Sequence, residues 1–358
     1  MAVAVTVVAV ALAIGVPAAV FSHDHGTRKA PSRSSYSDQH GWRWAAYRDV
    51  EVKVPASWKD DYASARPDCI PRKATARGPK ADSAEAPTAP YVTYGDAPVV
   101  VPTMGCRPER RPGDPDPTFG ALPFRLWQPY VEFDVPRPDL TVNGQSPQLK
   151  DAEMSYRGWH LTRTTTHGIQ ITVLSTPGKK ALARTVLDSL RTVRTTQLGC
   201  PTASSVLARQ PTAPIGTPLP KAEEIGGVTI CDYLGGHAHT GLSGSRRIVG
   251  QRARDLARAI HDAPSGSAPD NPTRCLQPEQ TDRALVLRFS RTGAAADDPV
   301  TEAYVYFDSC VGNGIREPGG MHALTTGDCR PLFAAPPIGM WSADSDVFAR
   351  CEPDATTG

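Results

Sequence analysis

The sequence predicts an α+β protein, with an N-terminal membrane helix followed by two disulfide-stapled α+β domains, each an antiparallel sheet with a packed helix. Three observations lead to this prediction. Residues 1–21 contain no charged side chain. The chain has eight cysteines, an even number, and all of them follow that run. In each half, short alternating strand patterns occur together with one amphipathic helical pattern, which is typical of α+β folds.

The apolar run 1–21 is long enough to cross a bilayer, because about 20 residues at ~1.5 Å rise span its ~30 Å core. A cleaved signal peptide begins with basic residues and ends at a small-residue site. This run has no basic start, and Pro17 and Val20 flank the candidate site at Ala18 and Ala19. We expect an uncleaved single-pass anchor, with a cleaved signal and a secreted protein as the alternative.

Residues 22–39 are polar, serine-rich and without periodicity, which predicts a flexible tether. Arg28 and Lys29 lie just after the apolar run, and the positive-inside rule alone would place the following chain in the cytoplasm. Long domains translocate largely regardless of such charges. The cysteines favour an oxidising space, so we expect the C-terminal body outside the cytoplasm.

The eight cysteines have no C-x-x-C spacing, which disfavours zinc-ribbon and thioredoxin-type sites. Eight cysteines allow 105 pairings. We expect pairs that are local in sequence, each contributing about 3–4 kcal/mol by loop entropy. The expected pairs are Cys69–Cys106, Cys200–Cys231, Cys275–Cys310 and Cys329–Cys351.

The first domain is expected over 40–198. Strand patterns occur at 42–47, 50–54, 91–94, 99–101, 130–135, 158–163 and 169–174. A closing helix follows, with Thr176 as N-cap and Pro177 at the first helical position. Its apolar face comprises Leu182, Val186, Leu190 and Val193.

A proline-rich linker is expected at 199–222 and a second domain over 223–358. Strand patterns occur at 227–233, 246–249, 284–289 and 302–307, of which the last two predict an antiparallel pair. A helix expected after Gly250, between the strands at 246–249 and 284–289, has one apolar face and ends at Pro264; that face comprises Ala253, Leu256, Ala257 and Ile260. The tail 321–351 is expected to be irregular.

Two resemblances add to this interpretation. The early VEVKVPASW, a hairpin and the late ALARTVLDSLRTV resemble the plan of Mog1/PsbP-like domains over 40–198, which implies a binding or assembly module. The series VTICDY, GSRRIVGQRARDLARAIHDAP, ALVLRFS and VYFDSCVGNG resembles a domain of unknown function in exported, membrane-anchored actinobacterial proteins over 225–325. That resemblance implies an exported protein and no catalytic residues.

Catalytic and metal-binding patterns are incomplete. Gly241–Ser245 comes near the G-x-S-x-G nucleophile elbow, but its last residue is serine, so a glycine–serine turn is the simpler interpretation. His237 and His239 could form part of a metal site, as could His23 and His25 in the tether, but solvated loop histidines are commoner. A hydrolase or metal-binding protein using the 237–245 loop remains the alternative function.

Other polar side chains fit solvated surfaces. His160 and His167 belong to a threonine-rich sheet face. Arg252, Arg254 and Arg258 fit a solvated helix face, with contact to a polyanion as the alternative. The six tryptophans are expected in the core, or at a binding groove; they are Trp42, Trp44, Trp58, Trp127, Trp159 and Trp341.

The charge balance of 39 basic and 37 acidic residues disfavours a nucleic-acid partner. We expect no cofactor, no metal and no catalytic residue. The sequence therefore favours a non-enzymatic, membrane-anchored module that binds an envelope protein or a cell-wall component, and it does not name the ligand. An accessory subunit of a neighbouring membrane protein fits equally well.

Overall fold

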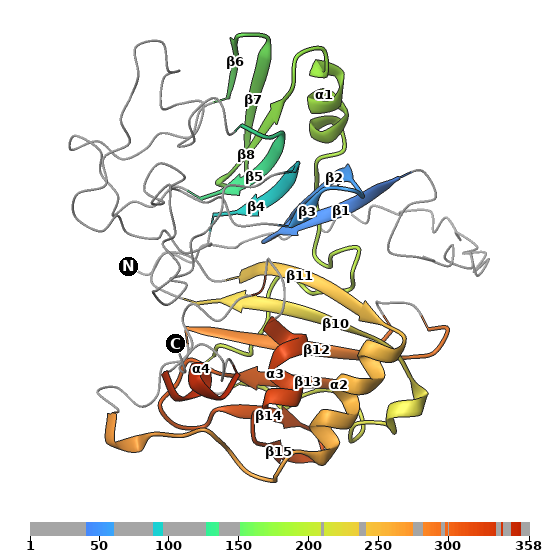
Figure 1. Cartoon of the computed structure of the whole chain (residues 1–358), viewed down its shortest axis with the longest axis vertical. Helices are drawn as coiled ribbons and strands as arrows, with labels where there is room; N and C mark the ends of the chain where they lie inside the picture. The colour runs from blue at the N-terminus through green and yellow to red at the C-terminus, as the bar shows by residue number, and fades with distance from the viewer. Residues whose placement is uncertain are drawn as a thin grey trace, which may run out of the picture. The chain divides into compact units, whose positions relative to one another are not determined.

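The computed structural model describes residues 41–60, 89–95, 127–135, 151–208, 211–235, 241–274, 282–294, 298–299, 301–333, 338 and 345–351. All of these residues belong to one compact unit, residues 34–358. The expected anchor 1–21 and tether 22–39 lie outside the described residues, as does the expected strand at 99–101. The mixed α+β class is confirmed (Figure 1).

The first half contains two sheets instead of the single antiparallel sheet expected. A three-stranded sheet has the order β1-β2-β9 and a six-stranded sheet the order β3-β4-β5-β8-β7-β6. The strands are β1 Trp42–Tyr47, β2 Val50–Pro55, β3 Lys59–Asp60, β4 Tyr91–Tyr94, β5 Tyr130–Asp134, β6 Ala152–Tyr156, β7 Trp159–Thr166, β8 Ile169–Ser175 and β9 Arg191–Thr192.

The expectation of a purely antiparallel sheet in this half is wrong, because β3 pairs with β4, and β4 with β5, in parallel. Parallel neighbours need a connection of roughly a dozen residues or more. The chain between β3 and β4, and between β4 and β5, is long enough for this. In the antiparallel ladder β5-β8-β7-β6, the pairs β6–β7 and β7–β8 are hairpins of consecutive strands, whereas β5 pairs with β8 across the two intervening strands.

The expected closing helix is shorter than its apolar pattern. Helix α1 spans Lys180–Asp188, with Lys179 at the N-cap, so the expected cap at Thr176 is wrong. The Ser189 hydroxyl donates to the Val186 carbonyl and accepts the Lys53 backbone N–H, which ends the helix against β2. Leu190 and Val193 therefore follow the helix and flank strand β9.

The core of the first half lies between the two sheets and α1. Buried residues from β1, β2, β4, β5, β8 and α1 form one cluster: Ala45, Tyr47, Val50, Val52, Val54, Trp58, Val92, Tyr94, Val131, Phe133, Val135, Ile169, Ile171, Val173, Ala183 and Val186. Alternation along β2 and β8 places these side chains on one face of each strand.

The second half contains one six-stranded sheet of order β11-β10-β12-β13-β14-β15, in which every pair is antiparallel, as expected. Its strands are β10 Ile225–Leu234, β11 Gly241–Val249, β12 Arg283–Arg291, β13 Thr301–Tyr306, β14 Gly314–Glu317 and β15 Gly320–His322. Two short 3-10 helices, η4 Ala222–Glu224 and η5 Pro272–Arg274, lie between elements.

Three helices cover one face of this sheet: α2 Gln251–Asp262, α3 Thr326–Phe333 and α4 Ser345–Cys351 (Figure 1). The four α2 residues expected on its apolar face are all buried. They share a core with Ile230, Leu285 and Val305 of the sheet and Leu332 of α3. The sheet with one packed helix is confirmed in this half, with two further helices.

The irregular tail expected at 321–351 is wrong. At the start of helix α3, the Asp328 carboxylate accepts the Thr325 backbone N–H at 3.0 Å and the Thr325 hydroxyl at 2.7 Å, as the acidic residue does in one half of a capping box. Pro331 lies inside α3, a position at which proline is normally unfavourable in a helix.

Two disulfide bonds lie within the described residues. Cys200 is bonded to Cys231 and Cys329 to Cys351, as expected from the sequence. Cys310 is also disulfide-bonded, and its partner lies outside the described residues. Cys69, Cys106 and Cys275 lie outside them too, so the other two expected pairs stay predictions.

Among the helices that the structure describes, none has the length and apolar character needed to cross a membrane.

Candidate ligand-binding face

The second sheet has one face covered by helices and one lined by polar side chains. Along β10, Val228 and Ile230 point to the helices, so Thr229, Cys231 and Tyr233 point to the other side. Register extends this side across the neighbouring strands. We call it the polar face: Gly227, Thr229, Cys231, Tyr233, Ser245, Arg247, Val286, Arg288, Ser290, Glu302, Tyr304, Tyr306 and Arg316.

The polar face differs from an ordinary solvated sheet face because much of it is buried. Thr229 and Ser290 are 0 % exposed, Tyr304 is 3 % and Glu302 is 8 % exposed. A solvated antiparallel face normally leaves its polar side chains in water. Here they are packed and hydrogen-bonded, so their positions are fixed before any ligand arrives.

Segment 200–208 covers the end of the polar face near Tyr233. The Cys200–Cys231 disulfide joins the segment to β10, and the Tyr233 hydroxyl donates to the Pro201 carbonyl at 2.6 Å. Val206 is 1 % exposed and packs with Cys231 and Tyr233. This segment belongs to the expected linker 199–222, so that part of the linker is packed against the second sheet. The division into two domains at this point stays a prediction.

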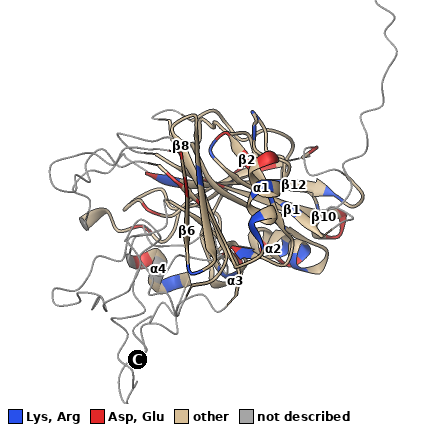
Figure 2. Ribbon diagram, turned by 90° about the horizontal axis from the view of Figure 1, so that it is seen from above, with Lys and Arg blue, Asp and Glu red and all other residues tan. Residues whose placement is uncertain are grey.

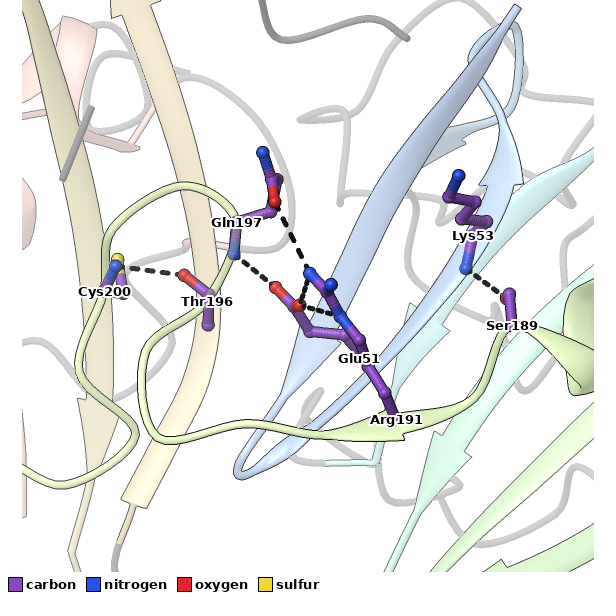
Figure 3. Close-up of polar contacts among 7 residues, drawn as sticks. All are labelled: Glu51, Lys53, Ser189, Arg191, Thr196, Gln197 and Cys200. Atoms are coloured by element: carbon purple, nitrogen blue, oxygen red, sulfur yellow. Dashed lines mark hydrogen bonds and ion pairs between the residues drawn. The ribbon is translucent and has the colours of Figure 1, made fainter. Parts of the chain in front are cut away.

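The chain between β9 and Cys200, which leads into this segment, is held by the buried Glu51 carboxylate of β2 (Figure 3). Glu51 is 0 % exposed and accepts the Arg191 guanidinium at 2.6 and 3.0 Å and the Gln197 backbone N–H at 2.5 Å. The Arg191 guanidinium also lies 3.7 Å from the centre of the Trp44 ring. The Thr196 hydroxyl then accepts the Cys200 backbone N–H at 3.0 Å. These contacts direct the chain from β9 to the disulfide.

Arg247 lies across the other end of the polar face. Its guanidinium donates to the Thr229 hydroxyl at 2.9 Å and to the Ser290 hydroxyl at 2.6 Å. The Ser290 hydroxyl in turn donates to the Gly227 carbonyl at 3.2 Å. A Cβ atom on Gly227 would lie 2.6 Å from Arg247 Nη2, so the glycine leaves the space that the guanidinium occupies.

The electrostatic surroundings of Arg247 are unusual for an arginine held in place. Burial lowers the pKa of its guanidinium, and this is the sole cause of the shift. Both hydrogen-bond partners are neutral hydroxyls, and no described carboxylate forms an ion pair with it. An arginine has five N–H donors. Two are used here, which leaves three that the described residues do not occupy.

The neighbouring arginine of the polar face is neutralised. Arg288 and Arg247 both lie opposite Thr229, on either side of β10. Arg288 Nε donates to Glu302 Oε1 at 3.0 Å, and both side chains are 11 % exposed. The row Arg247, Thr229, Arg288 and Glu302 therefore keeps one net positive charge, which is located on Arg247.

The expected turn at Gly241–Ser245 is wrong, and so is the nucleophile elbow. These residues form the start of strand β11, paired with β10 from Leu234 to Cys231. Ser243 is 4 % exposed within this strand, with no strained strand-to-helix turn around it. His237 and His239 lie outside the described residues. Among the residues described, no group of three His, Cys, Asp or Glu side chains is placed to hold a metal ion.

The other candidate residues have defined partners. The His167 ring lies at the β7–β8 turn and its Nδ1 is 2.7 Å from Asp49 Oδ2, while His160 Nδ1 is 2.8 Å from the Ser155 hydroxyl. These polar contacts hold a partly exposed sheet surface together.

The arginines of α2 lie on its exposed side, as expected. Arg258 Nη1 is 3.0 Å from Asp255 Oδ1, and Arg254 donates to the Gln251 side chain. Figure 2 shows basic and acidic positions interspersed over the described elements. The alternative of polyanion contact at α2 stays a prediction.

The tryptophans divide between core and surface. Trp58 and Trp127 are buried. Trp42, Trp44 and Trp159 are partly exposed, while Trp341 lies outside the described residues. Trp44 packs under Arg191, and Trp159 makes an edge contact with Trp127.

Sequence reasoning missed Arg247, Thr229 and Ser290. The sequence contains one signal for Thr229 and Ser290, because each is a polar residue in an otherwise apolar strand. By strand alternation, Thr229 lies on the same face as Cys231, and Ser290 on the same face as Val286. Assigning them to one site needed the register of β11, β10 and β12.

No family model matches the chain, and comparison with curated proteins and with solved structures gives no match either.

Proposed function

We propose that this protein is a non-enzymatic binding module of the cell envelope, anchored by residues 1–21 with its disulfide-bonded body outside the cytoplasm. It binds an envelope protein or a cell-wall component through the polar face. The single observation that carries the proposal is that this face holds buried, hydrogen-bonded polar side chains on a rigid antiparallel sheet. A binding site needs groups that are positioned in advance, and sheets position them better than loops.

The disulfides support the location. Cys200–Cys231 and Cys329–Cys351 are structural bonds between secondary-structure elements or the segments attached to them. Such bonds persist in oxidising compartments and are rare in the cytosol. The apolar run 1–21 supplies the means of reaching that compartment while staying at the membrane.

The hydrogen bonding of the polar face supports binding over catalysis. A serine nucleophile needs an adjacent base to take its proton. The Ser290 hydroxyl instead donates to the Gly227 carbonyl and accepts from the Arg247 guanidinium. Its proton is therefore directed at a backbone carbonyl, which is not a base that can take it, so these hydrogen bonds hold the hydroxyl as a structural group.

The location is tested by adding protease to intact spheroplasts that express the full chain. We expect the body to be digested from outside, and full-length protein on non-reducing gels to migrate faster than after reduction. Protection of the body until the membrane is permeabilised would place it in the cytoplasm and overturn the proposed location.

The binding role is tested by titrating detergent-solubilised full-length protein against isolated envelopes, separated into membrane-protein and cell-wall fractions. We expect saturable binding to one fraction. Arg316 is exposed on β14 and lies opposite Tyr304 on the polar face, so Arg316→Glu should weaken binding severalfold. Arg258 is exposed on α2, on the helix-covered side, so Arg258→Glu is the matched control and should bind as the wild type does.

Two results would contradict the binding role. One is absence of saturable binding to either fraction. The other is equal binding by the Arg316→Glu and Arg258→Glu variants, which would exclude the polar face as the contact surface.

A further inference from the structure

We infer that Arg247 forms the centre of an oxyanion-binding site, which takes a carboxylate or phosphate group of the ligand at the polar face. The inference rests on the proposed binding role of this face and specifies the chemistry of what it binds. It starts from the contrast between a fixed guanidinium and the lack, among the described residues, of an anion to match it.

Two buried hydroxyls of the sheet hold the Arg247 guanidinium in place. Thr229 and Ser290 are both 0 % exposed and lie beneath Arg247, which is itself partly exposed. Their hydroxyl oxygens hold Nη1 at 2.9 Å and Nη2 at 2.6 Å. A long, flexible side chain that is already held in one conformation loses less entropy when it binds a ligand.

The donors that remain suit an oxyanion. The three N–H groups unused by described residues belong to a planar fork that matches the spacing of two oxygens in a carboxylate or phosphate. Neutral hydroxyl partners leave the positive charge of Arg247 uncompensated, whereas Glu302 compensates that of Arg288. An incoming anion therefore meets one available charge at a defined position.

Other charged groups near this end of the sheet are already paired or distant from the fork. Glu224 lies 3.8 Å from Arg291 Nη2, at the outer end of β12. Arg288 and Arg247 are two strands apart, which corresponds to roughly 10 Å at ~4.8 Å per strand.

Gly227 leaves the space in which the Arg247 guanidinium lies. A side chain there would collide with the end of the Arg247 guanidinium, at 2.6 Å from Nη2 and 2.9 Å from Cζ. The collision involves the far end of a flexible side chain, so Gly227→Ala should displace the guanidinium while leaving the backbone of the sheet in place. This variant separates the position of the fork from the presence of the charge.

The test measures binding of inorganic phosphate and of acetate to the full-length protein, by chemical-shift titration at constant ionic strength set with sodium chloride. We expect saturable shifts for residues around Arg247 with at least one of the two anions. Which anion binds more tightly assigns the ligand group as phosphate or carboxylate. Arg247→Gln should weaken binding about tenfold or more, because a bidentate charge-assisted pair is lost.

Three further variants make the test specific. Gly227→Ala should weaken binding to a similar degree while near-ultraviolet circular dichroism stays as in the wild type. Arg247→Lys keeps the charge but loses the fork, so it should bind more weakly than the wild type and more tightly than Arg247→Gln. Arg258→Gln, on the exposed face of α2, should leave binding unchanged.

The inference is overturned if the wild type shows no saturable shift with either anion, or if Arg247→Gln binds as tightly as Arg258→Gln. These results are distinguishable from failure of the proposed function. Envelope binding that depends on Arg316 but persists in Arg247→Gln keeps the function and removes the oxyanion site.

Discussion

Arg247 and Arg283 belong to the same sheet, but they are held in opposite ways. Arg283 points to the helix-covered side, is 3 % exposed and forms an ion pair with Asp232, which is 0 % exposed. Arg247 points to the polar face, is partly exposed and is held by two neutral hydroxyls. A buried charge must be paired inside the protein. A charge at a surface that receives a ligand is more useful when it is fixed and left unneutralised.

The largest difference between the two arginines is expected in stability. Asp232→Ala removes the described carboxylate partner of the buried Arg283 guanidinium and should cost about 3–5 kcal/mol of unfolding free energy. Arg247→Gln removes two hydrogen bonds at a partly exposed position and should cost about 1 kcal/mol. Urea unfolding followed by circular dichroism measures both. Equal costs for the two variants would contradict the assignment of Arg283 as structural and Arg247 as a ligand-binding group.

Removal of each disulfide tests the helix-covered face and the polar face of the second sheet one at a time. Cys329→Ser with Cys351→Ser frees α3 from α4 on the covered side, and Cys200→Ser with Cys231→Ser frees segment 200–208 from the polar face. The sequence separations of 22 and 31 predict losses of about 3–4 kcal/mol in each case by loop entropy.

The two disulfide variants should nevertheless differ in spectroscopy. Tyr233 and Tyr304 pack around Cys231, so loss of Cys200–Cys231 should reduce the tyrosine bands in near-ultraviolet circular dichroism. Loss of Cys329–Cys351 should leave those bands close to the wild type. A reversed pattern would show that segment 200–208 does not hold the polar face.

A smaller effect is expected from a carboxyl beside Arg283. Asp308 Oδ2 accepts the backbone N–H groups of Asp282 and Arg283 at 3.0 and 2.8 Å, and burial raises the pKa of Asp308 to about 7 from an ordinary value of 3.8. Because the pKa of Asp308 is higher in the folded state than in the unfolded state, its contribution to the free energy of unfolding is fully present below pH 4. That contribution is lost as the pH rises through about 7.

Asp308→Asn should remove that part of the pH dependence. On going from pH 5 to pH 8, the unfolding free energy of the variant should rise relative to that of the wild type by on the order of 2 kcal/mol. This figure allows for partial exposure of the carboxyl. Urea unfolding at the two pH values gives the difference. The wild type also contains Asp328, whose pKa burial raises to about 6, so the comparison uses the change between variants and not the slope of one protein. An unchanged difference would mean that Asp308 is ionised in the folded state at pH 5.

The smallest effect is expected at the solvated side of α2. Arg258 pairs with Asp255 at 3.0 Å and with Glu223 at 3.9 Å, and all three side chains are exposed. Exposed ion pairs contribute little, so Arg258→Gln should change the unfolding free energy by less than about 0.5 kcal/mol. A loss above about 1 kcal/mol by urea unfolding would show that this arginine is not merely solvated.

The sequence predicts those parts of the fold whose patterns are local. Helix α2 follows from the spacing of Ala253, Leu256, Ala257 and Ile260, and the β12–β13 pair follows from two apolar runs close in sequence. The pairings Cys200–Cys231 and Cys329–Cys351 follow from short separations. In each case the residues that decide the structure are near one another in the chain.

Other elements depend on partners that are distant in the sequence. The start of β11, Gly241–Ser245, has no alternating pattern and becomes a strand because β10 pairs with it. The parallel pairs of β3, β4 and β5 join strands separated by long segments. Pro331 argues against α3, yet it is tolerated near the end of that helix.

The candidate site could not be predicted from local sequence patterns either. Arg246 and Arg247 are identical and adjacent, but strand alternation directs them to opposite faces. Arg246 donates to the carbonyls of Pro331 and Leu332 at the end of α3, with the Leu332 contact at 2.6 Å. Arg247 meets the hydroxyls of the polar face. Only the register of β10 and β11 distinguishes the structural Arg246 from Arg247, for which we propose ligand binding.

The backbone of Leu242 has a consequence for how the two halves depend on each other. Strand β11 is at the edge of its sheet, and the Leu242 carbonyl accepts the Arg48 N–H from the β1–β2 turn at 2.7 Å, while its N–H donates to the Thr202 carbonyl at 3.3 Å. An unprotected sheet edge recruits strands from other molecules. A C-terminal half cut free of β1 and β2 would lose the Arg48 contact, and we expect its exposed β11 edge to pair with other copies of itself.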